Sequence, residues 1–197
     1  MVRSILAALL AMAMLLSAGC DSSGVEFNGK DISGLMPDLK FSLTGENGET
    51  VTEARYQGEA VVLFFGYTHC PDYCPTTLTA LAQALQKMSP EEREQLRVLF
   101  VSVDPERDTP ELLAKYTGYF SPRVDGLTGD KEALDALTKR YRTAYSYGEP
   151  DANGNYLVNH GLAMYGFDRD GKVRVFMRND QPVERIAEDL RALIRIQ

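Results

Sequence analysis

A long apolar run that ends at a pair of cysteines constrains most strongly how this chain can fold. Residues 60–67 read AVVLFFGY, with β-branched and aromatic residues throughout, and the next eight residues read THCPDYCP. Such a run without polar alternation predicts a strand buried on both faces, as in a sheet covered by helices. Residues 75–88 then place Leu78, Leu81 and Leu85 at helical spacing. A buried strand, a cysteine loop and a helix are therefore predicted in immediate succession.

The rest of the chain alternates between strands and helices in a similar way. The predicted segments are a hairpin at 37–52, strands at 60–67 and 96–105, helices at 75–88, 109–120 and 130–141, a short strand at 124–129, two strands within 156–179 around a turn at 168–171, and a closing helix at 181–196. Strand–helix alternation implies parallel crossovers, and the late antiparallel pair makes the sheet mixed. We therefore expect an α/β fold with a mixed central sheet, helices on both faces and an N-terminal hairpin extension. A strand that leads into cysteines at a helix start is the thioredoxin arrangement.

The N-terminus has the pattern of an export signal. Arg3 precedes an apolar run at 5–15 that is too short for a comfortable membrane span, and LSAGC ends this run at Cys20. The ending resembles a bacterial lipobox, in which the cysteine becomes the lipid-carrying N-terminus. The alternative is an ordinary secretory signal with a chance cysteine at this position.

This pattern predicts the domain organisation and the location. Residues 1–19 are expected to form a lipoprotein signal peptide, residues 20–34 a polar tether and residues 35–197 the folded domain. Asp21 directly after the cysteine resembles a signal for staying in the inner membrane. We therefore expect a chain anchored by lipid to the bacterial inner membrane, with its domain facing the periplasm.

The cysteine count isolates Cys70 and Cys74 as one pair. The chain has three cysteines, and lipid on Cys20 would leave these two to pair with each other or to bind something together. Both precede prolines, so residues 70–74 are not expected to form a regular helical turn. Pro75 fits the first turn of the next helix, with Cys74 near its cap. The positive end of the helix dipole there favours thiolate over thiol.

The wide spacing of the cysteines permits a disulfide, a redox switch or a metal site. The two histidines of the chain are the candidates for a third metal ligand. His69 is expected to point away from the neighbouring Cys70, whereas His160 could reach the cysteine loop in a thioredoxin-like fold. Two thiolates and one imidazole suit Cu(I), and can hold Cu(II) with an added ligand. Zinc would want a fourth ligand, for which Asp72 is available.

Two aspartates follow the second buried strand, where sites gather in α/β sheets. Asp104 and Asp108 are spaced D-x-x-x-D. We expect them, together with Asp72, to serve in partner docking or in electrostatic support of the site, with capping of the next helix as the alternative for Asp108.

Three segments together resemble the Sco (SenC) family of copper-binding, thioredoxin-fold proteins. They are VVLFFGYTHCPDYCPTTL, then VSVDPERDTP, then a lone histidine before a strand that ends in FDRDG, and the resemblance runs from about residue 35 to 195. It implies copper ligation by Cys70, Cys74 and His160, and a role in delivering copper to, or reducing the cysteines of, the CuA site in cytochrome c oxidase subunit II. Members often carry serine after the distal histidine, where this chain has Gly161.

The function expected from these residues is that of a copper metallochaperone rather than an enzyme. The alternatives are a periplasmic thiol–disulfide oxidoreductase that acts through Cys70 and Cys74, or a redox sensor. Expected partners are cytochrome c oxidase subunit II, and another periplasmic copper chaperone or a thiol reductase. A formal net charge of -7 argues against nucleic-acid binding, which needs a basic face. Peroxidase activity is not expected, because Tyr67 stands where peroxiredoxins typically have threonine.

Overall fold

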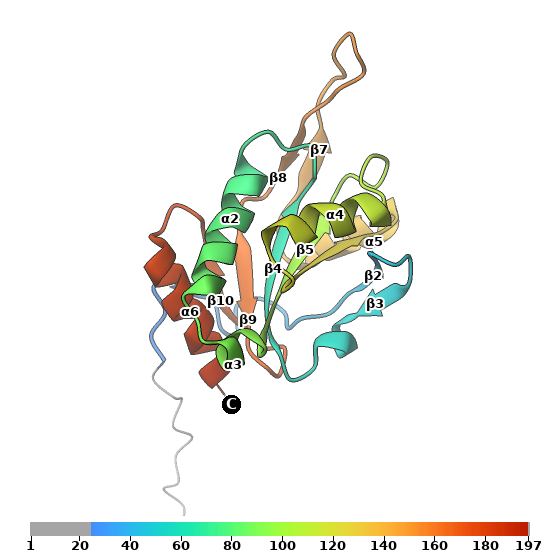
Figure 1. The fold of residues 1–197 in the computed structure, drawn as a ribbon. Helices are drawn as coiled ribbons and strands as arrows, with labels where there is room; N and C mark the ends of the chain where they lie inside the picture. Colours follow the sequence, from blue (N-terminus) through green and yellow to red (C-terminus); the bar gives the residue numbers. More distant parts are fainter. Residues whose placement is uncertain (1–24, 197) are drawn as a thin grey trace, which may run out of the picture.

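The computed structural model describes residues 25–196 and has an eight-stranded mixed sheet at its centre (Figure 1). Its strand order is β1-β10-β9-β4-β5-β6-β2-β3, with β4, β5 and β6 parallel and β9 antiparallel to β4. The elements are β1 (Lys30–Asp31), β2 (Ser42–Gly45), β3 (Thr50–Thr52), the 3₁₀ helix η2 (Glu53–Tyr56), β4 (Ala60–Gly66), α2 (Tyr73–Gln86), α3 (Pro90–Arg93), β5 (Leu96–Ser102), α4 (Pro110–Phe120), β6 (Val124–Thr128), α5 (Lys131–Arg140), β7 (Tyr145–Tyr147), β8 (Val158–His160), β9 (Met164–Phe167), β10 (Val173–Met177) and α6 (Val183–Arg195). The expected α/β architecture is confirmed, and the N-terminal hairpin β2–β3 extends the sheet beyond β6.

Helices cover both faces of this sheet. On one face the ring of Phe100 in β5 lies 5.4 Å from that of Tyr116 in α4. On the other face Tyr165 of β9 lies 5.5 Å from Tyr141, which follows α5. All seven residues of β4 are buried, as expected for a strand in the middle of a covered sheet.

Two helices are capped by the first residues of their predicted ranges, 109–120 and 130–141. The Thr109 hydroxyl accepts a hydrogen bond from the Leu112 backbone N–H at 3.3 Å, and Pro110 is the first residue of α4. The Asp130 carboxylate accepts from the Ala133 N–H at 2.8 Å at the start of α5. These local signals predicted the helix starts correctly because capping involves only residues within one turn.

The predicted start of helix α2 at residue 75 is two residues too late, although Cys74 does lie near the cap as expected. Helix α2 begins at Tyr73, one residue before Cys74, and Asp72 is the N-cap. A proline clashes mainly with the carbonyl four residues before it, and for Pro75 that residue is Pro71, which precedes the helix. The preference of a residue before proline for extended backbone is therefore outweighed here, and Cys74 lies in the first helical turn.

The predicted pair of strands around the turn at 168–171 is confirmed as β9 and β10 of the main sheet. No separate strand is predicted for the residues before β9, but they form β8, which pairs only with β7 in a separate two-stranded sheet. The loop that joins β7 to β8 projects from the top of the molecule (Figure 1). We call residues 145–160 the histidine arm, because β8 ends at His160.

The folded part of the chain begins before residue 35. Strand β1 pairs antiparallel with β10 at the edge of the sheet. Just before it, the backbone N–H groups of Asn28 and Gly29 donate to the Asp189 carboxylate of α6 at 2.6 and 2.9 Å. The predicted tether at 20–34 therefore contains a segment that packs on the domain. The predicted signal peptide, residues 1–19, and the predicted lipidation site Cys20 lie outside the described residues.

Candidate metal centre

The cysteine pair lies where β4 passes into α2. Cys74 is fully buried and Cys70 is partly exposed. A Cβ atom on Gly66, the last residue of β4, would lie 2.8 Å from the Cys74 sulfur and 2.5 Å from the Phe100 ring. Only glycine therefore leaves room for the sulfur beside the strand end. Sequence reasoning did not single out Gly66, although a glycine that ends an apolar strand is a known sign of close approach.

His160 reaches the cysteines across 86 residues of sequence. Its Nε2 atom lies 3.4 Å from the Cys74 sulfur. One ligand atom from each of Cys70, Cys74 and His160 lies within 4.8 Å of the other two. The structure therefore brings together the three residues that the sequence singled out as a metal-ligand set.

The imidazole of His160 is held with its ligand nitrogen free. Nδ1 lies 2.9 Å from the carbonyl oxygen of Gly161, which can only accept, so Nδ1 carries the proton. In the neutral ring Nε2 then presents a lone pair towards the sulfurs. Phe64 and Tyr67 contact the ring edge-on, at centroid distances of 6.1 and 5.8 Å. These contacts fix both the tautomer and the direction of the ring.

The two thiols differ in their charge state. A hydrogen bond from the Cys74 thiol, aided by the backbone N–H groups of Cys74 and Asp72, lowers the pKa of Cys70 to about 4. The same hydrogen bond and burial raise the pKa of Cys74 far above its ordinary value. At neutral pH the pair therefore holds one proton, with the thiolate on the more exposed Cys70.

Hydrogen bonds to Asp108 hold the loop that carries the cysteines. Its fully buried carboxylate accepts hydrogen bonds from the backbone N–H and the hydroxyl of Thr68, at 2.8 and 2.6 Å, and from the Ser102 hydroxyl at 2.5 Å. Thr68 lies two residues before Cys70, so Asp108 ties the cysteine loop to the end of β5. The capping role considered for Asp108 falls instead to Thr109.

Asp104 contacts the histidine arm. Its buried carboxylate accepts from the Tyr156 phenol at 2.9 Å and from Arg107 Nε at 2.6 Å. Burial and the bond to Asp104 raise the pKa of Tyr156 to about 12, so this phenol stays protonated as a donor. Because Asp104 and Asp108 are both fully buried, neither carboxylate is exposed for docking to a partner.

Two other candidates lie beside the ligand group rather than in it. His69 is half-exposed, with Nδ1 3.0 Å from the Thr68 hydroxyl and 3.5 Å from Asp108. The Asp72 carboxylate faces the Thr76 hydroxyl at 3.4 Å. Among residues 25–196, the group of ligand atoms contains neither of them, so a fourth protein ligand for zinc is not found there.

The structure explains why residue 161 is glycine in this chain. A Cβ atom at this position would overlap the hydroxyl of Thr143, which precedes the histidine arm. Serine here would therefore force Thr143 to move, next to the backbone carbonyl that orients His160. The departure from the usual family residue leaves His160 in the ligand group.

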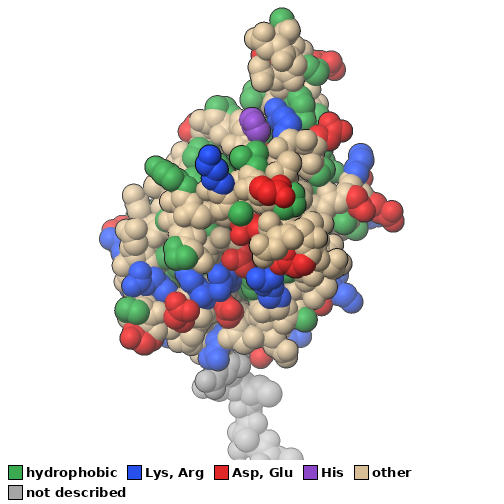
Figure 2. All heavy atoms as spheres, turned by 45° about the vertical axis from the view of Figure 1, so that its right-hand side comes forward, with side chains coloured by type: hydrophobic (Ala, Val, Ile, Leu, Met, Phe, Trp, Pro, Cys, Tyr) green, Lys and Arg blue, Asp and Glu red, His purple; other side chains and the backbone are tan. Residues whose placement is uncertain are grey.

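The surface beside this centre carries apolar, polar and charged side chains. Figure 2 shows a histidine below the projecting loop with apolar side chains and a basic side chain beside it, and charges of both signs over the rest of that face. A groove of about 530 Å³ lies between the cysteine loop and the arm, lined by His69, Pro71, Arg107, Tyr156 and Leu157 among others. None of the three ligands lines this groove, but Cys70 and His160 are themselves partly exposed to solvent.

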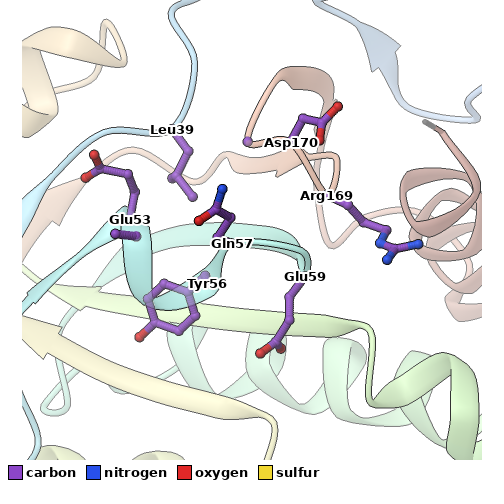
Figure 3. A pocket seen from close by; sticks show the side chains of 9 residues that line it. Leu39, Glu53, Tyr56, Gln57, Glu59, Arg169 and Asp170 are labelled. Carbon is purple, nitrogen blue, oxygen red and sulfur yellow. The ribbon is translucent and has the colours of Figure 1, made fainter.

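A second hollow, of about 270 Å³, lies at the other end of β4 (Figure 3). Glu53, Tyr56, Glu59 and Arg169 line it, and none of the predicted site residues does. Its carboxylates and arginine are not soft metal ligands. The chemistry predicted from the sequence is therefore confined to the end of the sheet where β4 meets α2.

The donor set fits copper. Two sulfurs and one imidazole nitrogen are soft and borderline ligands, which suit Cu(I), and their mutual distances leave room for one ion between them.

The described residues contain no helix with the length and apolar character needed to span a bilayer.

Comparison with known proteins gives a consistent result. The SCO1/SenC family model matches residues 35–195. The mitochondrial protein SCO1 homolog of Mus musculus is 39% identical over 156 residues, which cover 79% of this chain and 55% of that protein. The chain thus spans about half the length of this curated relative.

Solved structures agree with the sequence comparison. The copper-bound structure of ScoI from Bradyrhizobium japonicum aligns with a TM-score of 0.72 and 35% identity, over 80% of this chain and 99% of that one. The structure of a SCO1/SenC family lipoprotein from Bacillus anthracis aligns with a TM-score of 0.68 and 28% identity, over 85% and 99% of the two chains. With the family model matching most of its length, this chain belongs to the SCO1/SenC family.

Proposed function

We propose that this protein is a copper metallochaperone that binds one copper ion through Cys70, Cys74 and His160. The observation that carries this proposal is the convergence of two sulfurs and one imidazole nitrogen within 4.8 Å. The copper-bound relative from Bradyrhizobium japonicum supports the choice of metal. Copper is the cargo here, so the site has to release the ion as well as bind it.

The recipient in this proposal is the CuA site of cytochrome c oxidase subunit II. Membership of the SCO1/SenC family supports this assignment. The domain would work in the periplasm, held at the inner membrane by lipid on Cys20, and the Bacillus anthracis relative described as a lipoprotein supports that anchor. Another copper chaperone would load the site, or a thiol reductase would restore its cysteines.

A second function is favoured by the charge state of the thiols. The partly exposed Cys70 is a thiolate beside the buried, protonated Cys74. Such a pair can attack a partner's disulfide through Cys70 and resolve the mixed disulfide through Cys74. The partner would gain two electrons and the Cys74 proton from the pair, and its second proton from water, while Cys70 and Cys74 would form a disulfide. This reaction needs no contribution from His160.

Removal of His160 separates the two functions. In the reduced protein, His160→Ala should lower Cu(I) affinity by about a hundredfold, because one of three ligands is lost while both thiols remain. Titration against a chromophoric Cu(I) chelator measures this change. The reaction of the dithiol with a small disulfide should stay within about twofold of wild type. Unaltered copper affinity in His160→Ala would refute the three-ligand site.

A further inference from the structure

The histidine arm has its own small sheet rather than a place in the main one. Strands β7 and β8 pair with each other through three residue pairs, with Tyr145 opposite His160. Between them, residues 148–157 form the projecting loop (Figure 1). Side-chain contacts therefore matter more for holding this arm against the domain than they do for a strand of the main sheet.

Three hydrogen bonds and one cation–π contact join the arm to one short segment after β5. The Tyr156 phenol donates to Asp104 at 2.9 Å. Arg107 donates from Nη1 to the Tyr156 carbonyl oxygen at 3.0 Å, and its guanidinium lies 3.6 Å from the centre of the Tyr156 ring. The Tyr147 phenol donates to the Val103 carbonyl oxygen at 2.8 Å. Tyr147 at the end of β7 and Tyr156 two residues before β8 are thus held by residues 103–107.

The same segment also holds the other half of the ligand set. Asp108 bonds Thr68 in the cysteine loop, and its own backbone N–H donates to the Asp104 carbonyl oxygen at 2.9 Å. Asp104 and Asp108 are both fully buried, where hydrogen bonds to a carboxylate are strong and poorly replaced by water. The D-x-x-x-D segment therefore sets the position of the arm relative to the cysteines.

From this geometry we infer that Asp104, Arg107 and Tyr156 form a latch that positions His160 as a copper ligand and slows copper release. The inference rests on the proposed copper-binding function. With the latch closed, the arm is held to the β5–α4 connection and Nε2 stays beside the Cys74 sulfur. With the latch open, the arm is held less firmly, and copper can pass to an acceptor from the two cysteines. Asp104, Arg107 and Tyr156 are positioning residues, since they act through the arm.

The test is the rate of Cu(I) release from the full-length, reduced protein. Excess bathocuproine disulfonate captures the released ion, and its absorbance reports the rate in a stopped-flow instrument. Tyr156→Phe removes one hydroxyl and keeps the ring over Arg107. It should accelerate release about tenfold, the factor expected from loss of one hydrogen bond to a buried carboxylate. A release rate within twofold of wild type would contradict the latch hypothesis.

Tyr145→Phe is the matched control. It removes the same group from the same arm, but the Tyr145 phenol donates to Asp135, which is half-exposed to water. Because water can replace that bond, release from this variant should stay within about twofold of wild type. Equal acceleration by Tyr145→Phe and Tyr156→Phe would overturn the latch, since any loosening of the arm would then have the same effect.

A double variant distinguishes the latch from the metal site itself. In a His160→Ala background, Tyr156→Phe should change the release rate by less than about twofold, because the latch acts only through His160. A tenfold faster release in that background would contradict the latch hypothesis. If His160→Ala itself released copper at the wild-type rate, the proposed three-ligand site would fail instead. The two failures are therefore separate outcomes.

Discussion

The two halves of the candidate copper site are built in different ways. The cysteine half comes from the centre of the fold: β4 is bonded on one side to β5 and on the other to β9, and Cys74 is fully buried. The histidine half comes from an arm whose short strands pair only with each other, and whose loop exposes Leu157 to 60%. One half is thus part of the cooperative core, and the other is attached to it by side chains.

This difference has a consequence for copper exchange. A site made wholly from core elements could open only by disrupting the core, which costs a large part of the folding free energy. A site with one ligand on an attached arm can lose that ligand while the fold stays intact. The cysteine half is also negatively charged before copper binds, because the lowered pKa of Cys70 makes it a thiolate in the metal-free protein. We interpret the cysteines as the permanent part of the site and His160 as the exchangeable part.

Amide hydrogen exchange should give the largest contrast between the halves. Backbone amides of β4 have partners on both sides within the buried sheet, whereas those of β7 and β8 lie in a two-stranded sheet at the surface. Protection factors in β4 should therefore exceed those in β7 and β8 by at least about a hundredfold. Exchange read by NMR or mass spectrometry measures this. Equal protection would mean that the arm opens only when the whole domain unfolds.

A methyl group at Gly66 should damage the cysteine half. In Gly66→Ala the new Cβ would press on the Phe100 ring and the Cys74 sulfur. Overpacking of this kind in a buried site should lower the free energy of unfolding by about 1–3 kcal/mol. It should also weaken Cu(I) binding, because the sulfur is displaced. Urea unfolding and chelator competition measure the two effects.

Gly118→Ala is the control for this substitution. Gly118 lies inside α4, and a Cβ atom there has no neighbour within 4 Å. Alanine is the better helix former, so this variant should gain about 0.5–1 kcal/mol and leave copper binding unchanged. A loss of stability in both variants would show that the close approach at Gly66 is not the cause.

The pH dependence of Cu(I) affinity tests the charge state of the cysteine half. The lowered pKa of Cys70, about 4, and the raised pKa of Cys74 leave one proton on the pair at neutral pH. Copper binding to both sulfurs then releases one proton, so affinity should rise about tenfold for each pH unit between 7 and 8. Two ordinary thiols would release two protons and give a rise of about a hundredfold. Chelator competition, corrected for the chelator's own protonation, distinguishes these slopes.

Much of the cysteine half could be predicted from local sequence. The apolar run of β4, the capping residues of α4 and α5, and the position of the cysteines before α2 all depend on neighbours within a few residues. Local reasoning still misplaced the first turn of α2, because the penalty for a residue before proline is small enough for the helix to overcome. It also missed Gly66, whose neighbours Phe100 and Cys74 come from other elements.

The histidine half could be predicted only in part. The presence of a lone distant histidine, and the resemblance to the Sco family, pointed to His160 as a ligand. The strand pattern at 156–167 did not reveal that β8 leaves the main sheet, because apolar alternation looks the same in either sheet. The sequence after β5 also did not reveal that Asp104 and Asp108 are buried and hydrogen-bonded to the arm and the cysteine loop, since a carboxylate after a strand is compatible with several roles.

The sequence by itself determined which chemical groups are present and how the core elements form, because hydrophobic periodicity and helix capping act over one or two turns. Only the tertiary structure decided that residues 86 apart meet at 3.4 Å, and that one buried D-x-x-x-D segment bonds both the cysteine loop and the histidine arm. Such contacts depend on how the chain crosses between strands, which no local pattern specifies. The copper ligands are therefore readable in the sequence, whereas the device that positions them exists only in the fold.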